Sequence, residues 1–286
     1  MNTKFSIISF KKLNSYFSYK KSKMFSNRSD FINLDNFIKE GQIKEDPDIS
    51  SYKIIDKTTN NKYIANIFQK DINEYTKEKL SEFSNDFSFS SKFNHPSILK
   101  YVGYSPVDFK KNPRPVIITD DNENLYRIID SRSIDFDSPE YNIKKYIIIY
   151  GIASAMSYLH LHDIIHCDLS AQNIYLDENY YPKLTGFHYS QFLSDKPSTT
   201  SIDRFSKYKG NLEYFSPEIF KFKNYSKASD VYAFSIIVYE IFRGSKPFNY
   251  DTFFKHLKEI VFDNEILTNE FIFDDIPSYY SGLIQK

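Results

Sequence analysis

The chain changes its hydrophobic period about a third of the way along. Early on, apolar and polar residues alternate in short runs, which is the pattern of strands. Such runs are SYKIID (51–56), KYIANIF (62–68), ILKYVGY (98–104) and PVIIT (115–119). The turn sequence TTNN (58–61) separates the first two runs. Together these runs predict a strand-rich region.

A helical period then replaces the alternation. A polar helix is expected earlier, over roughly 72–92, among the strands. NIKKYIIIYGIASAMSYLH (142–160) predicts a long amphipathic helix. ASDVYAFSIIVYEIFR (228–243) is apolar almost all round, which is typical of a helix buried at the centre of a lobe. We therefore expect an α+β protein with a β-rich lobe over about 32–120 and a helical lobe over about 121–286.

The N-terminal segment, residues 1–31, differs from the rest in charge. Its basic residues stand against a single acidic one, Asp30, and are Lys4, Lys11, Lys12, Lys20, Lys21, Lys23 and Arg28. The segment is Ser-rich and has no continuous apolar run, which argues against a secretory signal. We expect a disordered tail here. A basic arm for an anionic surface is the alternative.

The overall composition narrows the functional class. Basic and acidic residues balance at 37 each, so no global charge favours a nucleic-acid or membrane partner. No apolar run approaches the ~20 residues of a membrane span. Cys167 is the single cysteine, which excludes an internal disulfide and fits a reducing compartment. We expect a cytoplasmic protein with no membrane span and no nucleic-acid partner.

Five stretches in order resemble the eukaryotic protein kinase superfamily, and most of all its tyrosine-kinase-like group. They are NHPSILKYVGYSP (94–106), MSYLHLHDIIHCDLSAQNIYLD (156–177), PKLTGFHYS (182–190), GNLEYFSPE (210–218) and SDVYAFSIIVYEIFRGSKPF (229–248). The resemblance covers about residues 32–286 and implies a bilobal kinase fold. The chain ends before the family's last helices, so we expect a truncated C-lobe, with that surface either supplied by a partner or missing.

The resemblance implies a definite chemistry. In the family, a Gly-rich loop and a strand lysine hold the phosphates of ATP, and an aspartate and an asparagine hold Mg²⁺. A second aspartate orients the attacking hydroxyl. Asp168 and Asn173 match the catalytic-loop aspartate and asparagine, and Asn173 is the one metal ligand expected if Mg²⁺ binds at all. The alternative is that both residues brace a tight loop through hydrogen bonds.

The family's metal-binding aspartate falls at Gly186. Eighteen residues separate it from Asp168, the spacing expected in the family. Mg²⁺ needs oxygen ligands, usually carboxylates beside phosphates and water, and glycine has none. His188 is no substitute, because a neutral imidazole is a poor magnesium ligand. This position therefore indicates that the metal site is lost.

The phosphate-binding positions are altered as well. The strand lysine aligns to Asn66 and its glutamate partner to Asp86, so neither the cation nor its usual partner is present. A relocated lysine, Lys44 or Lys53, is the alternative. Between residues 37 and 56 the only glycine is Gly41, and the acidic stretch KEDPD (44–48) stands where backbone N–H groups should approach phosphate. We interpret that stretch as a solvated acidic turn.

The adenine slot is expected to be filled from within. Ile64 replaces the family's small alanine and Tyr175 the residue below the adenine ring. With Thr119 they complete the degenerate ATP-site positions. The alternative is that both large side chains simply pack in the core, which would also leave no space for adenine.

Other matched positions are structural. Asp230 corresponds to the aspartate that braces the catalytic-loop backbone. His166 and Phe187 resemble members of the family's internal hydrophobic spine, whose next position falls at Ser90. Cys167 replaces the arginine that binds a phosphorylated residue of the activation segment in the family. A phosphate on the hydroxyls at 198–201 would therefore lack that partner.

We hypothesise a pseudokinase, a protein-interaction or allosteric signalling module that has lost phosphotransfer, needs no cofactor and acts through protein partners. A divergent ATP-dependent serine/threonine kinase using Mg-ATP is the alternative. A third possibility is a non-functional product of a truncated gene.

Overall fold

The computed structural model describes residues 31–45, 48–71, 74–76, 79–80, 83, 86, 89–90, 92–131, 138–194, 212–222 and 224–246. The expected tail before residue 31, the activation-segment hydroxyls and the chain after residue 246 lie outside the described residues. The chain divides into two compact units, residues 1–122 and 123–286, and each is described by itself.

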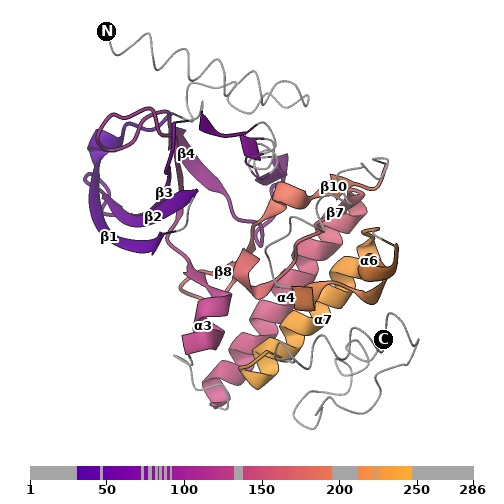
Figure 1. The fold of residues 1–286 in the computed structure, drawn as a ribbon. Coiled ribbons are helices and arrows are strands. Elements are labelled where there is room, and N and C mark those ends of the chain that lie inside the picture. Colours follow the sequence, from indigo (N-terminus) through magenta and orange to yellow (C-terminus); the bar gives the residue numbers. More distant parts are fainter. Residues whose placement is uncertain are drawn as a thin grey trace. The chain divides into compact units, whose positions relative to one another are not determined.

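The first unit contains one five-stranded antiparallel sheet in the order β1-β2-β3-β5-β4 (Figure 1). Its strands are β1 (Phe37–Glu45), β2 (Ile49–Asp56), β3 (Lys62–Phe68), β4 (Tyr101–Ser105) and β5 (Val116–Asp120). The four predicted strands are confirmed, and β3 has the predicted bounds. Every described residue between 79 and 92 is helical, as expected, but residues 74–76 are not α-helical, so the predicted start near residue 72 is wrong.

A short N-terminal strap gives this sheet a core on one face. Asn33 caps the 3₁₀ turn η2 (Leu34–Asn36) by accepting a hydrogen bond from the backbone of Asp35. Leu34 is buried and packs with the side chains of one sheet face, which are Phe37, Ile54, Ala65, Ile67, Val116 and Ile118. Because side chains alternate along a strand, Ile64 and Asn66 of β3 lie on the opposite face.

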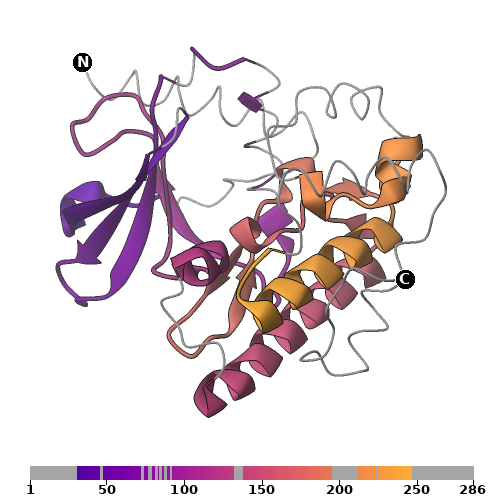
Figure 2. The same ribbon diagram turned by 60° about the horizontal axis from the view of Figure 1, so that its bottom comes forward.

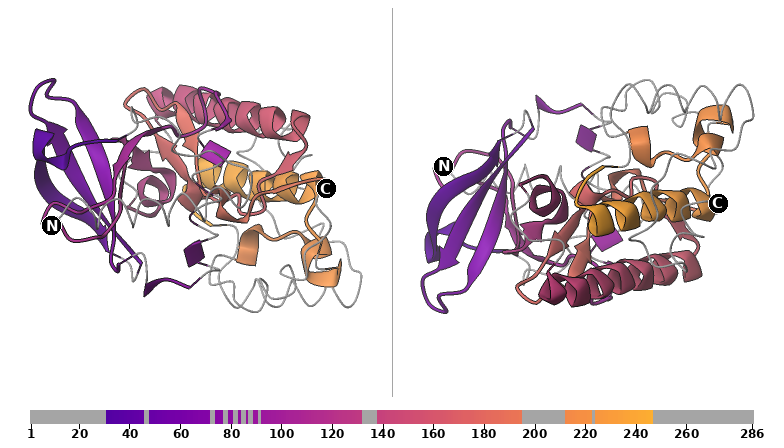
Figure 3. Two further views of the ribbon diagram at one scale, coloured as in Figure 1. Left: turned by 90° about the horizontal axis from the view of Figure 1, so that it is seen from above. Right: turned by 90° about the horizontal axis from the view of Figure 1, so that it is seen from below.

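The second unit begins at β6 (Glu123–Asn124) and is dominated by two helices, α4 (Pro139–Leu161) and α7 (Lys227–Arg243). They run side by side (Figures 2 and 3). The smaller elements are α3 (Leu125–Ser131), β7 (Ile164–Ile165), η4 (Ala171–Asn173), β8 (Ile174–Leu176), β9 (Pro182–Leu184), η5 (Phe187–Tyr189), β10 (Gln191–Phe192), η6 (Leu212–Tyr214) and α6 (Pro217–Phe222). Sheet β6-β8-β9 and the pair β10-β7 frame the loops between them.

Helix α7 follows its sequence signals closely. Ser226 and Ser229 form a reciprocal capping box at its start, and Gly244 ends it with φ of 62°. Ile236, Ile237 and other apolar side chains are buried along most of its length, as predicted for a central helix.

Helix α4 begins with Ser138, whose hydroxyl accepts a hydrogen bond from the backbone of Tyr141. The expectation of an amphipathic helix is wrong for its outer face. Ile143, Tyr146, Tyr150 and Leu161 are exposed there, so apolar side chains lie on both faces of the helix.

The expected α+β class, with a β-rich first lobe and a helical second lobe, is confirmed.

Candidate functional site

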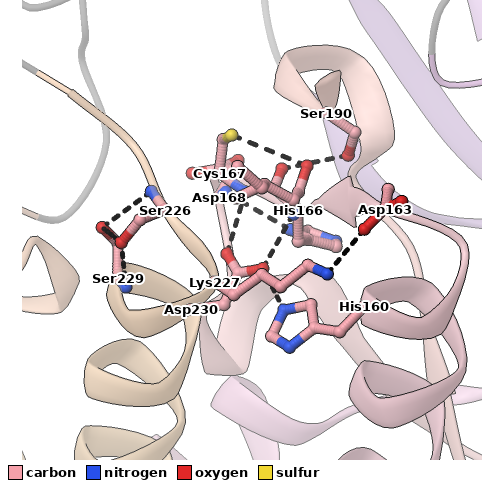
Figure 4. A network of polar contacts seen from close by, with 11 residues as sticks. His160, Asp163, His166, Cys167, Asp168, Ser190, Ser226, Lys227, Ser229 and Asp230 are labelled. Atoms are coloured by element: carbon pink, nitrogen blue, oxygen red, sulfur yellow. Dashed lines mark hydrogen bonds and ion pairs between the residues drawn. The ribbon is translucent and has the colours of Figure 1, made fainter. Parts of the chain in front are cut away.

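The loop from His166 to Asn173 connects β7 to β8 and is held from below by α7. Asp230, in the first turn of α7, is 2% exposed. Its carboxylate accepts hydrogen bonds from the backbone N–H groups of His166 (2.9 Å) and Cys167 (3.1 Å), and lies 2.9 Å from Nε2 of His160 (Figure 4). Three partners for one buried carboxylate satisfy its acceptors. Asp230 therefore has the bracing geometry expected for it.

His166 is a structural residue in a dry environment. It is fully buried, and burial lowers the pKa of its imidazole. Its Nε2 lies 2.9 Å from the carbonyl oxygen of Thr185, and its ring packs on Phe187 with centroids 5.0 Å apart. The neutral ring thus links the catalytic loop to the segment around Gly186. The remaining spine position, Ser90, is buried in the first unit.

Asp168 is bound by two neighbours that sequence reasoning did not pair with it. The side-chain amide of Asn173 donates to the backbone carbonyl of Asp168 at 2.7 Å and to its carboxylate at 2.8 Å. Nε2 of His188 lies 3.3 Å from the same carboxylate oxygen, and the Asp168 side chain is only 9% exposed. We call Asp168, Asn173 and His188 the clasp. In the clasp the amide nitrogen of Asn173 braces the loop through hydrogen bonds, as the bracing alternative expects.

Gly186 stands directly against the clasp. Its φ of 83° lies in the left-handed region that favours glycine. A Cβ atom at this position would lie 2.5 Å from Cγ of Asn173 and 2.7 Å from its amide nitrogen and oxygen. The side chain of Asn173 therefore fills the space where any side chain at position 186 would begin.

These residues do not fit a magnesium ion. Mg²⁺ requires near-octahedral oxygen coordination with at least one or two carboxylates. Gly186 supplies no side-chain oxygen, the amide nitrogen of Asn173 donates to the Asp168 carboxylate, and His188 presents a nitrogen to that same carboxylate. Across the part of the chain that the structure describes, no group of three His, Cys, Asp or Glu side chains could hold a metal ion.

The sheet unit brings three of the predicted ATP-site positions together. In the strand register, Ile64 stands between Lys53 of β2 and Thr119 of β5, and Asn66 pairs with Ser51. Asn66 accepts a hydrogen bond from the Ser51 hydroxyl at 2.7 Å. Ile64 and Thr119 are buried, at 9% and 6% exposure. An internal polar pair thus lies at the position that the sequence resemblance aligns with the family's lysine.

The other positions predicted in this unit have separate partners. Asp86 accepts a hydrogen bond from the Tyr101 hydroxyl at 3.1 Å. Lys53, one of the two relocated-lysine candidates, is 52% exposed in its side chain and lies 3.5 Å from Asp121. The side chain of Lys44, the other candidate, lies outside the described residues.

Asp48 is the one residue of the acidic stretch 44–48 whose side chain the structure describes. Its side chain is 33% exposed, its carboxylate lies 3.0 Å from Nζ of Lys79, and its carbonyl accepts from the hydroxyl of Tyr75 at 2.8 Å. Asp48 is therefore partly solvated and ion-paired, while the side chains at 44–47 lie outside the described residues.

Tyr175 and Cys167 complete the predicted positions, both in the second unit. Tyr175 lies on β8, where it pairs with Asn124 and Lys183 and is half-buried. Cys167 is 5% exposed and belongs to an apolar cluster with Phe215 and Ile219. Where the family has a phosphate-reading arginine, this chain has a core residue.

Sequence reasoning did not single out a buried carboxyl group in α7. Glu240 of α7 is 1% exposed and accepts hydrogen bonds from the Tyr214 hydroxyl at 2.9 and 2.8 Å. Burial raises the pKa of this carboxyl to about 8, although Tyr214 and Lys246 both lower it. The signal in the sequence was a lone glutamate inside an apolar helix.

Comparison with known proteins places the chain in a family. The protein kinase domain model matches residues 49–280, so the chain belongs to the protein kinase superfamily, as its motifs indicated. Aurora kinase of Eremothecium gossypii is 28% identical over 209 residues, which are 72% of this chain and 51% of that protein. Ephrin type-B receptor 3 of Homo sapiens is 28% identical over 176 residues, 61% of this chain and 17% of the receptor. Wall-associated receptor kinase-like 17 of Arabidopsis thaliana is 30% identical over 176 residues, 59% of this chain and 21% of that protein.

The chain thus matches about half of the length of the first relative and about a fifth of the other two. No helix among the described residues is long and apolar enough to cross a membrane.

Proposed function

We propose that this kinase domain is a pseudokinase, a protein-interaction or allosteric signalling module without phosphotransfer or a bound cofactor. The observation that supports the proposal is the arrangement of residues around Gly186. A residue without side-chain ligand atoms replaces the metal-binding aspartate, and the amide nitrogen of Asn173 donates a hydrogen bond to Asp168. We also propose a place in the tyrosine-kinase-like group, which rests on the sequence motifs alone.

The energetic argument concerns the charge of the triphosphate. Removing one preorganised electrostatic group from an active site typically costs ~3–4 kcal/mol in transition-state stabilisation, roughly a hundred- to a thousandfold in rate. Here the metal aspartate and the strand lysine are both replaced. Such losses are not additive, but either one alone would reduce phosphotransfer severely.

The contacts in the sheet unit support the same reading. Asn66 carries no charge to offset phosphate, and its side-chain oxygen accepts a hydrogen bond from the Ser51 hydroxyl inside the sheet. Lys53 is mostly exposed and pairs with Asp121, which gives no support to a relocated lysine there.

One observation favours the rival, a divergent ATP-dependent serine/threonine kinase. Asp230 still braces the catalytic loop that carries Asp168 and Asn173. An active kinase would need that brace for catalysis. A pseudokinase would also keep it, because the brace stabilises the fold.

A thermal-stability titration with nucleotide tests the proposal. The melting temperature of the full chain is measured with ATP alone, Mg²⁺ alone and MgATP. A ligand present at a hundred times its Kd stabilises a protein by about 2.7 kcal/mol. We expect no magnesium-dependent rise in melting temperature.

A transfer assay with radiolabelled ATP is the second arm. We expect no label on the chain or on a generic protein substrate above that seen with Asp168→Ala. Label that appears with the unmodified chain and vanishes in Asp168→Ala would establish the rival. Affinity capture with the unmodified chain, compared with a heat-unfolded control, then identifies the proposed protein partners.

A further inference from the structure

We propose that Asn173 blocks the metal site sterically, so that restoring an aspartate at position 186 cannot by itself rebuild it. This inference rests on the proposed loss of phosphotransfer and explains why the loss is hard to reverse. Asn173 matches a family metal ligand, yet in this chain it acts against metal binding.

The first step of the argument is space. A Cβ atom at residue 186 would meet three atoms of the Asn173 side chain at 2.5–2.7 Å. Real Cβ atoms do not approach other heavy atoms so closely, because repulsion rises steeply below van der Waals contact. Any residue other than glycine therefore requires Asn173 to move.

The second step is that Asn173 does not move freely. Its amide nitrogen donates two hydrogen bonds to Asp168, at 2.7 Å to the carbonyl and at 2.8 Å to the carboxylate. The second is a charge-assisted bond, which is stronger than a neutral one. Turning Asn173 aside breaks both bonds and removes a donor from a carboxylate that is only 9% exposed.

The third step is charge. One amide group separates position 186 from the Asp168 carboxylate, so an aspartate restored at that position would bring a second negative charge close to the first. Without a metal already present, two neighbouring carboxylates disfavour each other's ionised form. His188, 3.3 Å from Asp168, already occupies one approach to that carboxylate.

These three steps predict an order of events. Space at position 186 becomes available only after the Asn173 side chain is shortened. A carboxylate at 186 can then fit and bind a metal ion. A single reversion at 186 is destabilising and without benefit. The lost metal site is therefore separated from an active one by at least two coupled substitutions.

A double-mutant cycle on thermal stability tests the block without any metal. Gly186→Ala adds only a Cβ atom, and Asn173→Ala removes all three atoms that it would meet. The cost of the left-handed backbone at 186 is present in both backgrounds and cancels in the cycle. Gly41→Ala is the control for losing a glycine, since the Cβ added there meets no described atom within 4 Å.

We expect Gly186→Ala to lower the melting temperature by roughly 5–10 °C in the unmodified chain. At least half of that loss should disappear in the Asn173→Ala background. Additive losses would overturn the inference, because they would show that Asn173 does not oppose a side chain at 186.

Mn²⁺ is the metal probe, added alone to the full chain. We expect Gly186→Asp to gain no Mn²⁺-dependent stability, and the double variant Asn173→Ala with Gly186→Asp to gain it. Mn²⁺ binding by Gly186→Asp alone would overturn the inference. Stabilisation of the unmodified chain by MgATP would instead count against the proposed function, so the two failures are distinguishable.

Discussion

Two sets of residues differ in how well they match the kinase family. The residue that holds the catalytic loop matches, whereas the residues at the expected phosphate and metal positions do not. In the support, Asp230 retains three partners and is buried. At the chemical positions, the sequence resemblance aligns Asn66, Asp86 and Gly186 with the family's lysine, glutamate and aspartate. The comparison teaches that folding and phosphotransfer depend on different residues.

The reason lies in the cost of losing each side chain to the folded structure. Two backbone N–H groups of the buried loop depend on Asp230, and leaving each unsatisfied costs about 1–3 kcal/mol. The strand lysine and the metal aspartate serve the substrate and not the fold. Their replacements have acquired internal partners, Ser51 for Asn66 and Tyr101 for Asp86.

The largest effect is expected for Asp230→Ala. It removes the acceptor for two buried N–H groups and should lower the free energy of unfolding by about 3–5 kcal/mol. Chemical denaturation followed by circular dichroism measures this. Glu140→Ala is the control, since the Glu140 side chain is 80% exposed in a surface pair with Lys144 and its loss should cost far less than that of Asp230. Equal losses in the two variants would break the comparison.

The next effect concerns Glu240 and depends on pH. Its pKa is about 8 in the folded chain against 4.5 ordinarily. Below pH 4.5 the group is protonated in both states. Between pH 4.5 and 8 the unfolded chain loses the proton while the folded chain keeps it, so stability falls as pH rises, by up to ~1.4 kcal/mol per unit.

Glu240→Gln should remove that slope and raise the free energy of unfolding at pH 8 by about 2 kcal/mol or more. Denaturation curves at several pH values between 4.5 and 8 measure it. Glu213→Gln, at a partly exposed neighbour with 17% side-chain exposure, is the control and should leave most of the slope in place. An unchanged slope in Glu240→Gln would show that the buried carboxyl is not the source.

A smaller effect is expected within the clasp. Asn173→Ala removes two hydrogen bonds to Asp168 and should cost about 1–2 kcal/mol of unfolding free energy. Asn173→Asp should cost at least as much, because it sets a carboxylate against that of Asp168. The same denaturation assay ranks the two. A stabilising Asn173→Asp would indicate a bound cation beside Asp168 and would sharpen the case for the rival kinase.

The smallest effect is expected at Lys53. Lys53→Ala removes a 3.5 Å ion pair with Asp121 in which the Lys53 side chain is 52% exposed, and should change the free energy of unfolding by no more than ~0.5 kcal/mol. The nucleotide response in thermal shift should also be unaltered. A response to MgATP in the unmodified chain that Lys53→Ala abolishes would identify a relocated phosphate lysine and place Lys53 among the chemical positions.

Local patterns predicted most of the fold. β3 has the predicted bounds because its aromatic and β-branched residues form one run between a turn and a polar segment. α7 differs from its prediction by one residue, since Ser226 and Gly244 mark its ends. The start of α4 at Pro139 was missed although Ser138 and Pro139 form a recognisable helix start.

The candidate site was predicted by residue type but not by contact. The replacement of the metal-binding aspartate by Gly186 was predicted from the family resemblance and the spacing to Asp168. The turn of Asn173 onto Asp168, and the approach of His188, depend on how the hairpin of β8 and β9 folds back on the loop. No periodicity reports such contacts between separate segments. The ties of Asp48 to Lys79 and Tyr75 were missed for the same reason.

The burial of Cys167 makes this loop observable by simple chemistry. The chain has one thiol, 5% exposed beside the backbone that Asp230 holds. A disulfide reagent such as Ellman's can react only in those molecules whose loop has momentarily opened. The rate at which colour develops would therefore record the frequency of that opening, with no label attached and no other sulfhydryl to confuse the signal.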